Sequence, residues 1–229
     1  PYLTNDAAYP PSGLLYLAAV LEREGYNVEV VDLAGNPTWK DVIPTLAADL
    51  FGITCVTPNF RTVQEISLLL PTGAPIVVGG VHPTFLPQDV LGNIRCDAVV
   101  QGEAEVIILE LIKDLQQGRL KKVYDGGIAP VDSIPKPARH LVDLHKYRPG
   151  GEPTTPIYTS RGCPYNCNFC SKISGRQYRV FPLSQVMEEI EYVMGLGFRH
   201  ILFGDDDVGI HPKRLIKMLE MLLPLNLHF

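Results

Sequence analysis

Three cysteines, Cys163, Cys167 and Cys170, lie within eight residues in the loop sequence SRGCPYNCNFCSK. Thiolates are soft ligands for zinc and iron–sulfur clusters, and three so close together can converge on one metal centre. A structural zinc site normally has four protein ligands, yet His200 and His211 lie far along the chain. Three ligands to a four-iron cluster would leave one iron open to bind substrate. The spacing favours a cluster and leaves zinc or unligated thiols as alternatives.

This loop and the strand and helices around it resemble the radical S-adenosylmethionine superfamily. The signature of that superfamily is three cysteines at x3 and x2 spacing, with an aromatic residue before the last, where this chain has Phe169. The resemblance implies a 4Fe-4S cluster on Cys163, Cys167 and Cys170, with S-adenosylmethionine bound at the open iron. An electron from the cluster would cleave S-adenosylmethionine to methionine and a 5′-deoxyadenosyl radical, and Phe169 would lie near the adenine.

The sequence FGDDDVG puts Asp205, Asp206 and Asp207 at the carboxyl end of a predicted strand. Adjacent carboxylates repel one another unless they meet a cation or hydrogen-bond donors, and barrel active sites lie at that end of the strands. One interpretation is a solvated turn that caps the next helix. The resemblance favours the other, a partner for the ammonium group of S-adenosylmethionine, with Asp206 as the first choice and Asp205 as a second candidate.

Alternating strands and helices would position these groups. Apolar periodicity predicts strands at Thr155–Ser160 and Phe198–Gly204, helices at Pro182–Gly197 and His211–Leu223, and a further strand starting near Leu225. Repeated βα units of this size indicate a parallel barrel or part of one.

The first 118 residues also alternate between helices and strands. Their apolar strands are nearly continuous, which indicates burial on both faces of a parallel sheet. We therefore predict a Rossmann-like, doubly wound α/β domain whose first strand is missing from the start of the chain. The predicted helices are 13–25 and 103–118, and the predicted strands are 26–33, 49–56, 74–80 and 96–102.

This first domain resembles the cobalamin-binding domain fused to many radical enzymes, through the ordered segments PPSGLLYLAAVLEREGY, GITCVTPNF, VVGGVHPTF and VVQGEAE. Glycines at a strand end let a backbone approach a bulky flat ligand, and threonine and asparagine side chains could hydrogen-bond the ligand's amide groups. The candidate cobalamin-binding residues are Thr54, Thr57, Asn59, Gly79, Gly80, His82, Thr84, Gly102 and Glu103.

His82 is the one histidine in that set. Cobalamin domains that bind cobalt through histidine use an Asp-x-His-x-x-Gly motif, which the sequence GVHPTF lacks. We therefore expect base-off, His-off cobalamin, with His82 ordering its loop or contacting the cofactor edge. Cys55 and Cys96 lie in or beside apolar strands and are expected to be core thiols.

The net charge of −5 gives no basic footprint for nucleic acid and does not favour an anionic membrane. No apolar run reaches the roughly 18 residues that span a bilayer. Five cysteines, three of them clustered, indicate ligands in a reducing cytoplasm rather than a disulfide framework.

The sequence thus predicts a cobalamin-dependent radical S-adenosylmethionine enzyme, with a cobalamin-binding domain at 1–118, a proline-rich linker at 119–154 and the first units of a barrel at 155–229. The family implies methyl transfer, cyclisation or rearrangement of a small molecule, with an electron donor such as flavodoxin or ferredoxin. The alternative is a non-catalytic module that senses cobalamin or binds a partner, with a zinc-stabilised cysteine loop. Because the chain starts at Pro1 and ends at LPLNLHF, we expect it to be part of a longer protein.

Overall fold

The computed structural model describes residues 9–149, 151–171 and 173–229, so Pro1 lies outside the described residues. The chain divides into two compact units. Unit 1 comprises Val20–Val28 and Leu33–Ala129. Unit 2 comprises residues 9–19, Glu29–Asp32 and Pro130–Phe229.

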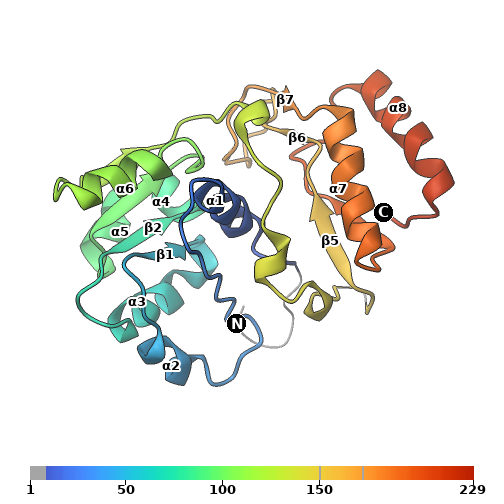
Figure 1. Ribbon diagram of the computed structural model, residues 1–229. Helices are drawn as coiled ribbons and strands as arrows, with labels where there is room; N and C mark the ends of the chain where they lie inside the picture. Colours follow the sequence, from blue (N-terminus) through green and yellow to red (C-terminus); the bar gives the residue numbers. More distant parts are fainter. Residues whose placement is uncertain (1–8, 150, 172) are drawn as a thin grey trace. The chain divides into compact units, whose positions relative to one another are not determined.

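Four parallel strands form the sheet of unit 1 in the order β1-β2-β3-β4 (Figure 1). The strands are β1 (Phe51–Thr54), β2 (Ile76–Gly79), β3 (Ala98–Gln101) and β4 (Val123–Asp125). The connecting helices are η2 (Thr57–Asn59), α3 (Phe60–Leu69), α4 (Val81–Phe85), α5 (Pro87–Asn93) and α6 (Ile108–Gln116). Earlier in the chain are α1 (Ser12–Arg23), whose residues are divided between the two units, α2 (Trp39–Val42) and η1 (Ile43–Thr45). This arrangement confirms the predicted α/β class with a parallel sheet.

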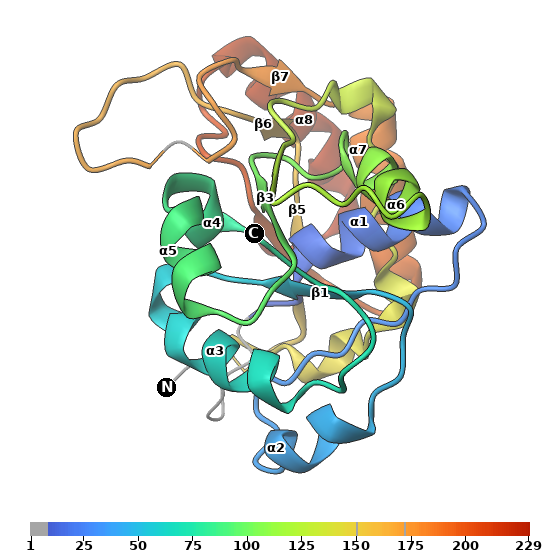
Figure 2. The same cartoon turned by 90° about the vertical axis from the view of Figure 1, so that its left-hand side faces the viewer.

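Both faces of the central strands are buried, as their apolar sequences predict. Val78 and Val99 pack into the core cluster with residues of α3 and α5. Val77 and Val100 come next along their strands, so they point to the opposite face, and they are also buried. In Figure 2, α3 and α5 lie on one side of the sheet and α6 lies on the other.

Two features of the first 129 residues differ from the sequence prediction. Tyr26–Leu33 forms no strand, although its apolar pattern predicts one. A strand needs a neighbour to complete its hydrogen bonds, and this segment pairs with none of the described strands. Conversely, β4 was not predicted, because its three residues lie in the proline-rich segment 119–154.

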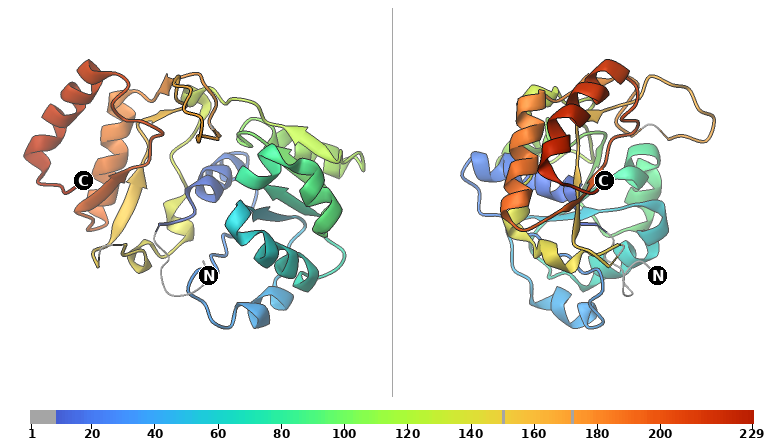
Figure 3. Two further views of the ribbon diagram at one scale, coloured as in Figure 1. Left: turned by 180° about the vertical axis from the view of Figure 1, so that it is seen from behind. Right: turned by 90° about the vertical axis from the view of Figure 1, so that its right-hand side faces the viewer.

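Unit 2 contains a βαβ arrangement. Strands β5 (Thr154–Ile157) and β8 (His200–Phe203) pair in parallel, and α7 (Leu183–Gly195) connects them. Helix α7 lies against β5, and α8 (Pro212–Leu222) runs beside α7 (Figures 1 and 3). An isolated parallel bridge joins His200 to His228, after the short helix η6 (Leu223–Leu225), where a third strand was predicted to start. The extension of these units into a barrel stays a prediction.

A buried ion pair attaches the proline-rich segment to the βα core of unit 2. This segment contains the short helices η3 (Val131–Ser133), η4 (Arg139–Leu141) and η5 (Leu144–Lys146). The Arg139 guanidinium donates to the hydroxyl of Thr155 at 2.6 Å, to the carbonyl of Pro156 at 2.7 Å and to the Glu189 carboxylate on α7. Burial raises the pKa of Glu189, and the positive charge of Arg139 opposes that rise.

Among the described residues, no helix is long and apolar enough to cross a membrane.

Candidate functional site

The candidate residues of unit 1 gather at one edge of its sheet. Thr54 ends β1, Gly79 ends β2, and the parallel register pairs these two residues directly. Gly102 follows the last residue of β3. Ligands of open parallel α/β sheets bind at the carboxyl ends of the strands, which is this edge.

Two glycines allow the backbone to pass closely here. Gly80 has a φ of +104°, and a Cβ at this position would lie 2.8 Å from the carbonyl oxygen of Cys55. Gly102 has a φ of +69°, and its Cβ would lie 2.8 Å from the carbonyl oxygen of Gly127. Both positions therefore require glycine for conformation and for space.

Hydrogen bonds order the loops of this edge. The Thr84 hydroxyl donates to the carbonyl of Gly80 at 2.7 Å and accepts from the Gly102 N–H at 3.1 Å. The Glu103 side chain is buried and accepts from the Ala129 N–H at 2.5 Å. Asn59 accepts from the Val56 N–H at 2.8 Å and so closes the turn after β1. Thr84, Glu103 and Asn59 therefore shape the edge, whereas Thr54 and Thr57 are exposed on it.

His82 is 5% exposed, and both of its ring nitrogens have partners. Its Nδ1 lies 3.1 Å from Thr57 Oγ1, and its Nε2 lies 3.0 Å from Asp89 Oδ2. The ring also packs on Phe60, with 4.6 Å between the ring centroids. These contacts fit the prediction that His82 orders its loop.

The other two cysteines, Cys55 and Cys96, belong to unit 1. Cys55 is fully buried, and burial together with the Asp89 carboxylate raises the pKa of its thiol to about 11. Cys96 is half-buried against the core cluster, and burial raises its pKa as well. Both thiols therefore remain protonated at neutral pH and pack as the sequence predicted.

The cysteine loop is tied down at its base. Strands β6 (Ser160–Arg161) and β7 (Arg179–Val180) pair in antiparallel fashion on either side of it. Gly162 has a φ of +80°, and a Cβ there would collide with the carbonyl oxygen of Gln177. The Cys163 N–H donates to the carbonyl of Gly175 at 3.2 Å. The described part of the loop projects away from β6 and β7 (Figure 2).

The three thiols of this loop are accessible but do not surround a common point. Cys163 is half-buried, Cys167 and Cys170 are exposed, and Phe169 is 92% exposed. Within residues 9–149, 151–171 and 173–229, no three histidine, cysteine, aspartate or glutamate side chains are grouped closely enough to hold a metal ion. The assignment of the cysteines as ligands therefore rests on their type and spacing.

The acidic turn after β8 contacts the base of that loop. The carboxylate of Asp205 accepts from the N–H of Thr159 at 3.1 Å, from the Thr159 hydroxyl at 2.9 Å and from the Ser160 hydroxyl. Asp206 is exposed and accepts from the Gly162 N–H at 3.0 Å, next to Cys163. Asp207 accepts from the Gly209 N–H within its own turn. The three aspartates thus have different roles that the sequence alone did not separate.

Several residues that support the site were not identified from the sequence. Arg214 on α8 donates to the carbonyls of Thr159 and Phe181, at 3.1 and 2.6 Å, and so fixes the strand end that Asp205 also contacts. Asp89, the partner of His82, lies on the next helix, seven residues later. Neither residue belongs to a recognisable motif, and only the folded chain brings them to their partners.

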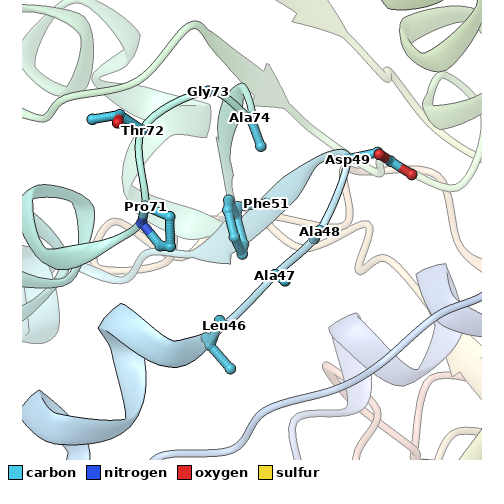
Figure 4. Close-up of a pocket in the computed structure, with 9 residues that line it drawn as sticks. All are labelled: Leu46, Ala47, Ala48, Asp49, Phe51, Pro71, Thr72, Gly73 and Ala74. Carbon is cyan, nitrogen blue, oxygen red and sulfur yellow. The ribbon is translucent and has the colours of Figure 1, made fainter.

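A cavity of about 330 Å³ lies at the opposite edge of the unit 1 sheet (Figure 4). It is formed by the segments that precede β1 and β2, so it lies at the amino ends of these strands. It contains none of the candidate residues. The residues that line it are Leu46, Ala47, Ala48, Asp49, Phe51, Pro71, Thr72, Gly73 and Ala74.

Comparisons with known proteins identify the family. A model of the B12 binding domain matches residues 4–112. The chain is 35% identical to an uncharacterized methyltransferase of Pyrococcus horikoshii, over 90% of this chain and 51% of that protein. It is 30% identical to the anaerobic magnesium-protoporphyrin IX monomethyl ester cyclase of Rubrivivax gelatinosus, over 96% of this chain and 45% of that protein. The chain thus spans about half the length of the curated relatives it matches.

A solved structure is similar to the chain over both units. The radical S-adenosylmethionine methyltransferase TsrM of Kitasatospora setae covers 94% of this chain, with a TM-score of 0.72 and 22% identity, and the match spans 48% of TsrM. The chain thus carries a B12 binding domain, is related to proteins named as a methyltransferase and a cyclase, and shares the fold of a radical S-adenosylmethionine methyltransferase. This confirms the family resemblance inferred from the cysteine loop and the glycine-rich strand ends.

We predict that Asp205→Ala destabilises unit 2 by about 1–3 kcal/mol, because the Thr159 and Ser160 groups, almost fully buried, lose their acceptor. Opening of the loop base should then speed trypsin cleavage after Arg161 and Arg179 by about fivefold or more, as measured by mass spectrometry of timed digests. Asp207→Ala is the matched control, since Asp207 only closes its own turn. Equal cleavage rates in the two variants would contradict the assigned role of Asp205.

Proposed function

We propose that the protein is a cobalamin-dependent radical S-adenosylmethionine enzyme. One observation carries this proposal: a three-thiolate loop, fixed at its base by the acidic turn, follows an α/β unit that matches the B12 binding domain. The relatives described above include a methyltransferase and a cyclase. We therefore assign methyl transfer to an unactivated centre of a small molecule, or cyclisation or rearrangement, as the reaction class.

The donor set of the loop fits a 4Fe-4S cluster. Cys163, Cys167 and Cys170 supply three soft ligands, and no other cysteine lies nearby in the sequence to close a four-ligand zinc site. Two of the thiols are exposed, so iron can reach them. When bound, the cluster supplies the electron for reductive cleavage of S-adenosylmethionine, and a donor such as flavodoxin or ferredoxin would reduce it in the cytoplasm.

The residues around the loop would bind S-adenosylmethionine. Asp206 is exposed next to Cys163, and it holds Gly162 through one carboxylate oxygen, so we assign it to the ammonium group. Both carboxylate oxygens of Asp205 already accept hydrogen bonds from Thr159, and this favours a bracing role for Asp205 over ligand contact. Phe169 presents an almost fully exposed ring, which suits stacking on adenine.

The carboxyl edge of unit 1 would bind cobalamin, which carries the methyl group in a methyl transfer. Gly80 and Gly102 let the loops of this edge pack closely against neighbouring backbone. Gly79 ends β2 without a side chain that would hold a flat macrocycle away, and exposed Thr54 and Thr57 offer hydroxyls to its amide side chains. Thr84 and Glu103 hold the surrounding loops in place, as does Asn59.

We predict that cobalamin binds without a histidine ligand to cobalt, because Thr57 and Asp89 occupy both ring nitrogens of His82. Electron paramagnetic resonance of the cob(II)alamin complex should show no nitrogen superhyperfine splitting from a protein histidine. Such splitting would overturn the His-off assignment. A wild-type chain that binds no cobalamin would overturn the cobalamin proposal itself.

We also predict that replacing Cys163, Cys167 and Cys170 together by alanine abolishes binding of iron and sulfide after anaerobic reconstitution. The double variant Cys55→Ala/Cys96→Ala is the control and should keep its iron, since these thiols lie in or against the core of unit 1. Iron and sulfide are measured per chain. Unchanged iron in the triple variant, or stoichiometric zinc in the wild-type protein, would contradict the cluster assignment and favour a zinc-stabilised module.

A further inference from the structure

At the carboxyl edge of the unit 1 sheet, a buried imidazole is hydrogen-bonded to an exposed hydroxyl. The residues are His82 on α4, Thr57 at the start of η2 and Asp89 on α5. His82 is 5% exposed, whereas Thr57 is exposed. Three separate elements therefore converge on one ring. Asp89 is exposed as well, but its two carboxylate oxygens already accept from His82 and Asn93, so the Thr57 hydroxyl is the group left for a ligand.

For a neutral ring, the two contacts set the direction of both of its hydrogen bonds. An ionised carboxylate only accepts, so Nε2 of His82 donates to Asp89 across 3.0 Å. In a neutral imidazole the other nitrogen then accepts, so the Thr57 hydroxyl donates to Nδ1 across 3.1 Å. With its hydrogen directed at the ring, the Thr57 oxygen presents its lone pairs as an acceptor.

The partners of the ring are themselves held. The His82 N–H donates to the carbonyl of Cys55 at 3.0 Å, which fixes the backbone of α4 against the end of β1. Asn93 donates from its side chain to Asp89 Oδ1 and to the carbonyl of Asp89, both at 2.9 Å. The group is therefore arranged before any ligand binds, which lowers the cost of binding.

Burying a polar ring costs free energy that an apolar side chain of similar volume would not incur. The packing of this ring on Phe60 would be satisfied by phenylalanine as well. What the histidine adds is two hydrogen bonds, one to Asp89 on α5 and one to Thr57. We therefore look for the function of the buried ring in its effect on the exposed Thr57 hydroxyl.

We propose that His82 and Asp89 are positioning residues that set the Thr57 hydroxyl as a hydrogen-bond acceptor for an N–H donor of the bound ligand. The carboxamide side chains of a corrin are donors of this chemistry. The inference rests on the proposed cobalamin function and deepens it, since it assigns a direction to one contact of that site. It also explains how a histidine can serve the cofactor without binding cobalt.

The test is the dissociation constant of hydroxocobalamin, titrated by absorbance against the wild-type chain and four variants. Thr57→Val keeps the shape and removes the hydroxyl, and we expect about fivefold weaker binding. Thr57→Ser restores the hydroxyl and should bind within about twofold of wild type. His82→Phe keeps a buried ring and should weaken binding as much as Thr57→Val. Thr72→Val, at the opposite edge of the sheet, is the control and should not change binding.

The double variant His82→Phe/Thr57→Val distinguishes positioning from a separate structural effect. We expect it to bind no more weakly than Thr57→Val alone, because both changes remove the same hydrogen bond. Fluorescence of Trp39, the one tryptophan of the chain and packed against the unit 1 core, checks that each variant is folded. If His82→Phe does not fold, Asp89→Ala takes its place, because loss of the carboxylate frees the ring from the tautomer that accepts from Thr57, and unchanged binding would then overturn the role of the pair.

The outcomes that overturn the inference are separate from those that overturn the proposed function. Normal binding by Thr57→Val, failure of Thr57→Ser to restore binding, or additive losses in the double variant would each overturn the role of His82 and Asp89. In all three cases the wild-type chain still binds cobalamin. Absence of hydroxocobalamin binding by the wild-type chain would overturn the proposed cobalamin function and this inference with it.

Discussion

The alignment of parallel strands is the constraint on which both candidate sites depend. In unit 1 the register that pairs Thr54 with Gly79 brings the carboxyl ends of β1 and β2 to one edge of the sheet. Because β3 pairs with β2 in parallel, its carboxyl end lies at the same edge. In unit 2 the pairing of β5 with β8 brings the turn that contains Asp205 to the start of the cysteine loop. Residues far apart in the sequence become neighbours because each strand ends on the same side.

In each unit, buried side chains order the loops of the candidate site, while other side chains of the site are exposed. At the unit 1 edge, buried His82 and Glu103 order the loops, while Thr54 and Thr57 are exposed. In unit 2, Asp205 joins buried groups of Thr159 and Ser160, while Cys167, Cys170 and Phe169 are exposed. A fixed base with accessible ligand atoms is the arrangement expected of a site that takes up a large cofactor.

The sequence predicted the elements with strong local patterns and missed those that depend on partners. Apolar runs located β1, β2, β3, β5 and β8, and helical periodicity located α1, α6, α7 and α8. Tyr26–Leu33 has the pattern of a strand but pairs with none of the described strands, while β4 is too short and too close to prolines to be recognised. The cysteine motif was specific because its chemistry requires fixed spacing. Asp89 and Arg214 act across 7 and 55 residues of sequence, so only the fold places them.

The central claim is that the cysteine loop holds a four-iron cluster with one iron free of protein thiolate. Mössbauer spectroscopy of the chain reconstituted with ⁵⁷Fe tests it directly, because irons with different ligands give different isomer shifts. The account predicts a 4Fe-4S spectrum in which one iron site differs from the rest and shifts when S-adenosylmethionine is added. A spectrum with uniformly ligated iron, or no cluster at all in the folded wild-type chain, would contradict it.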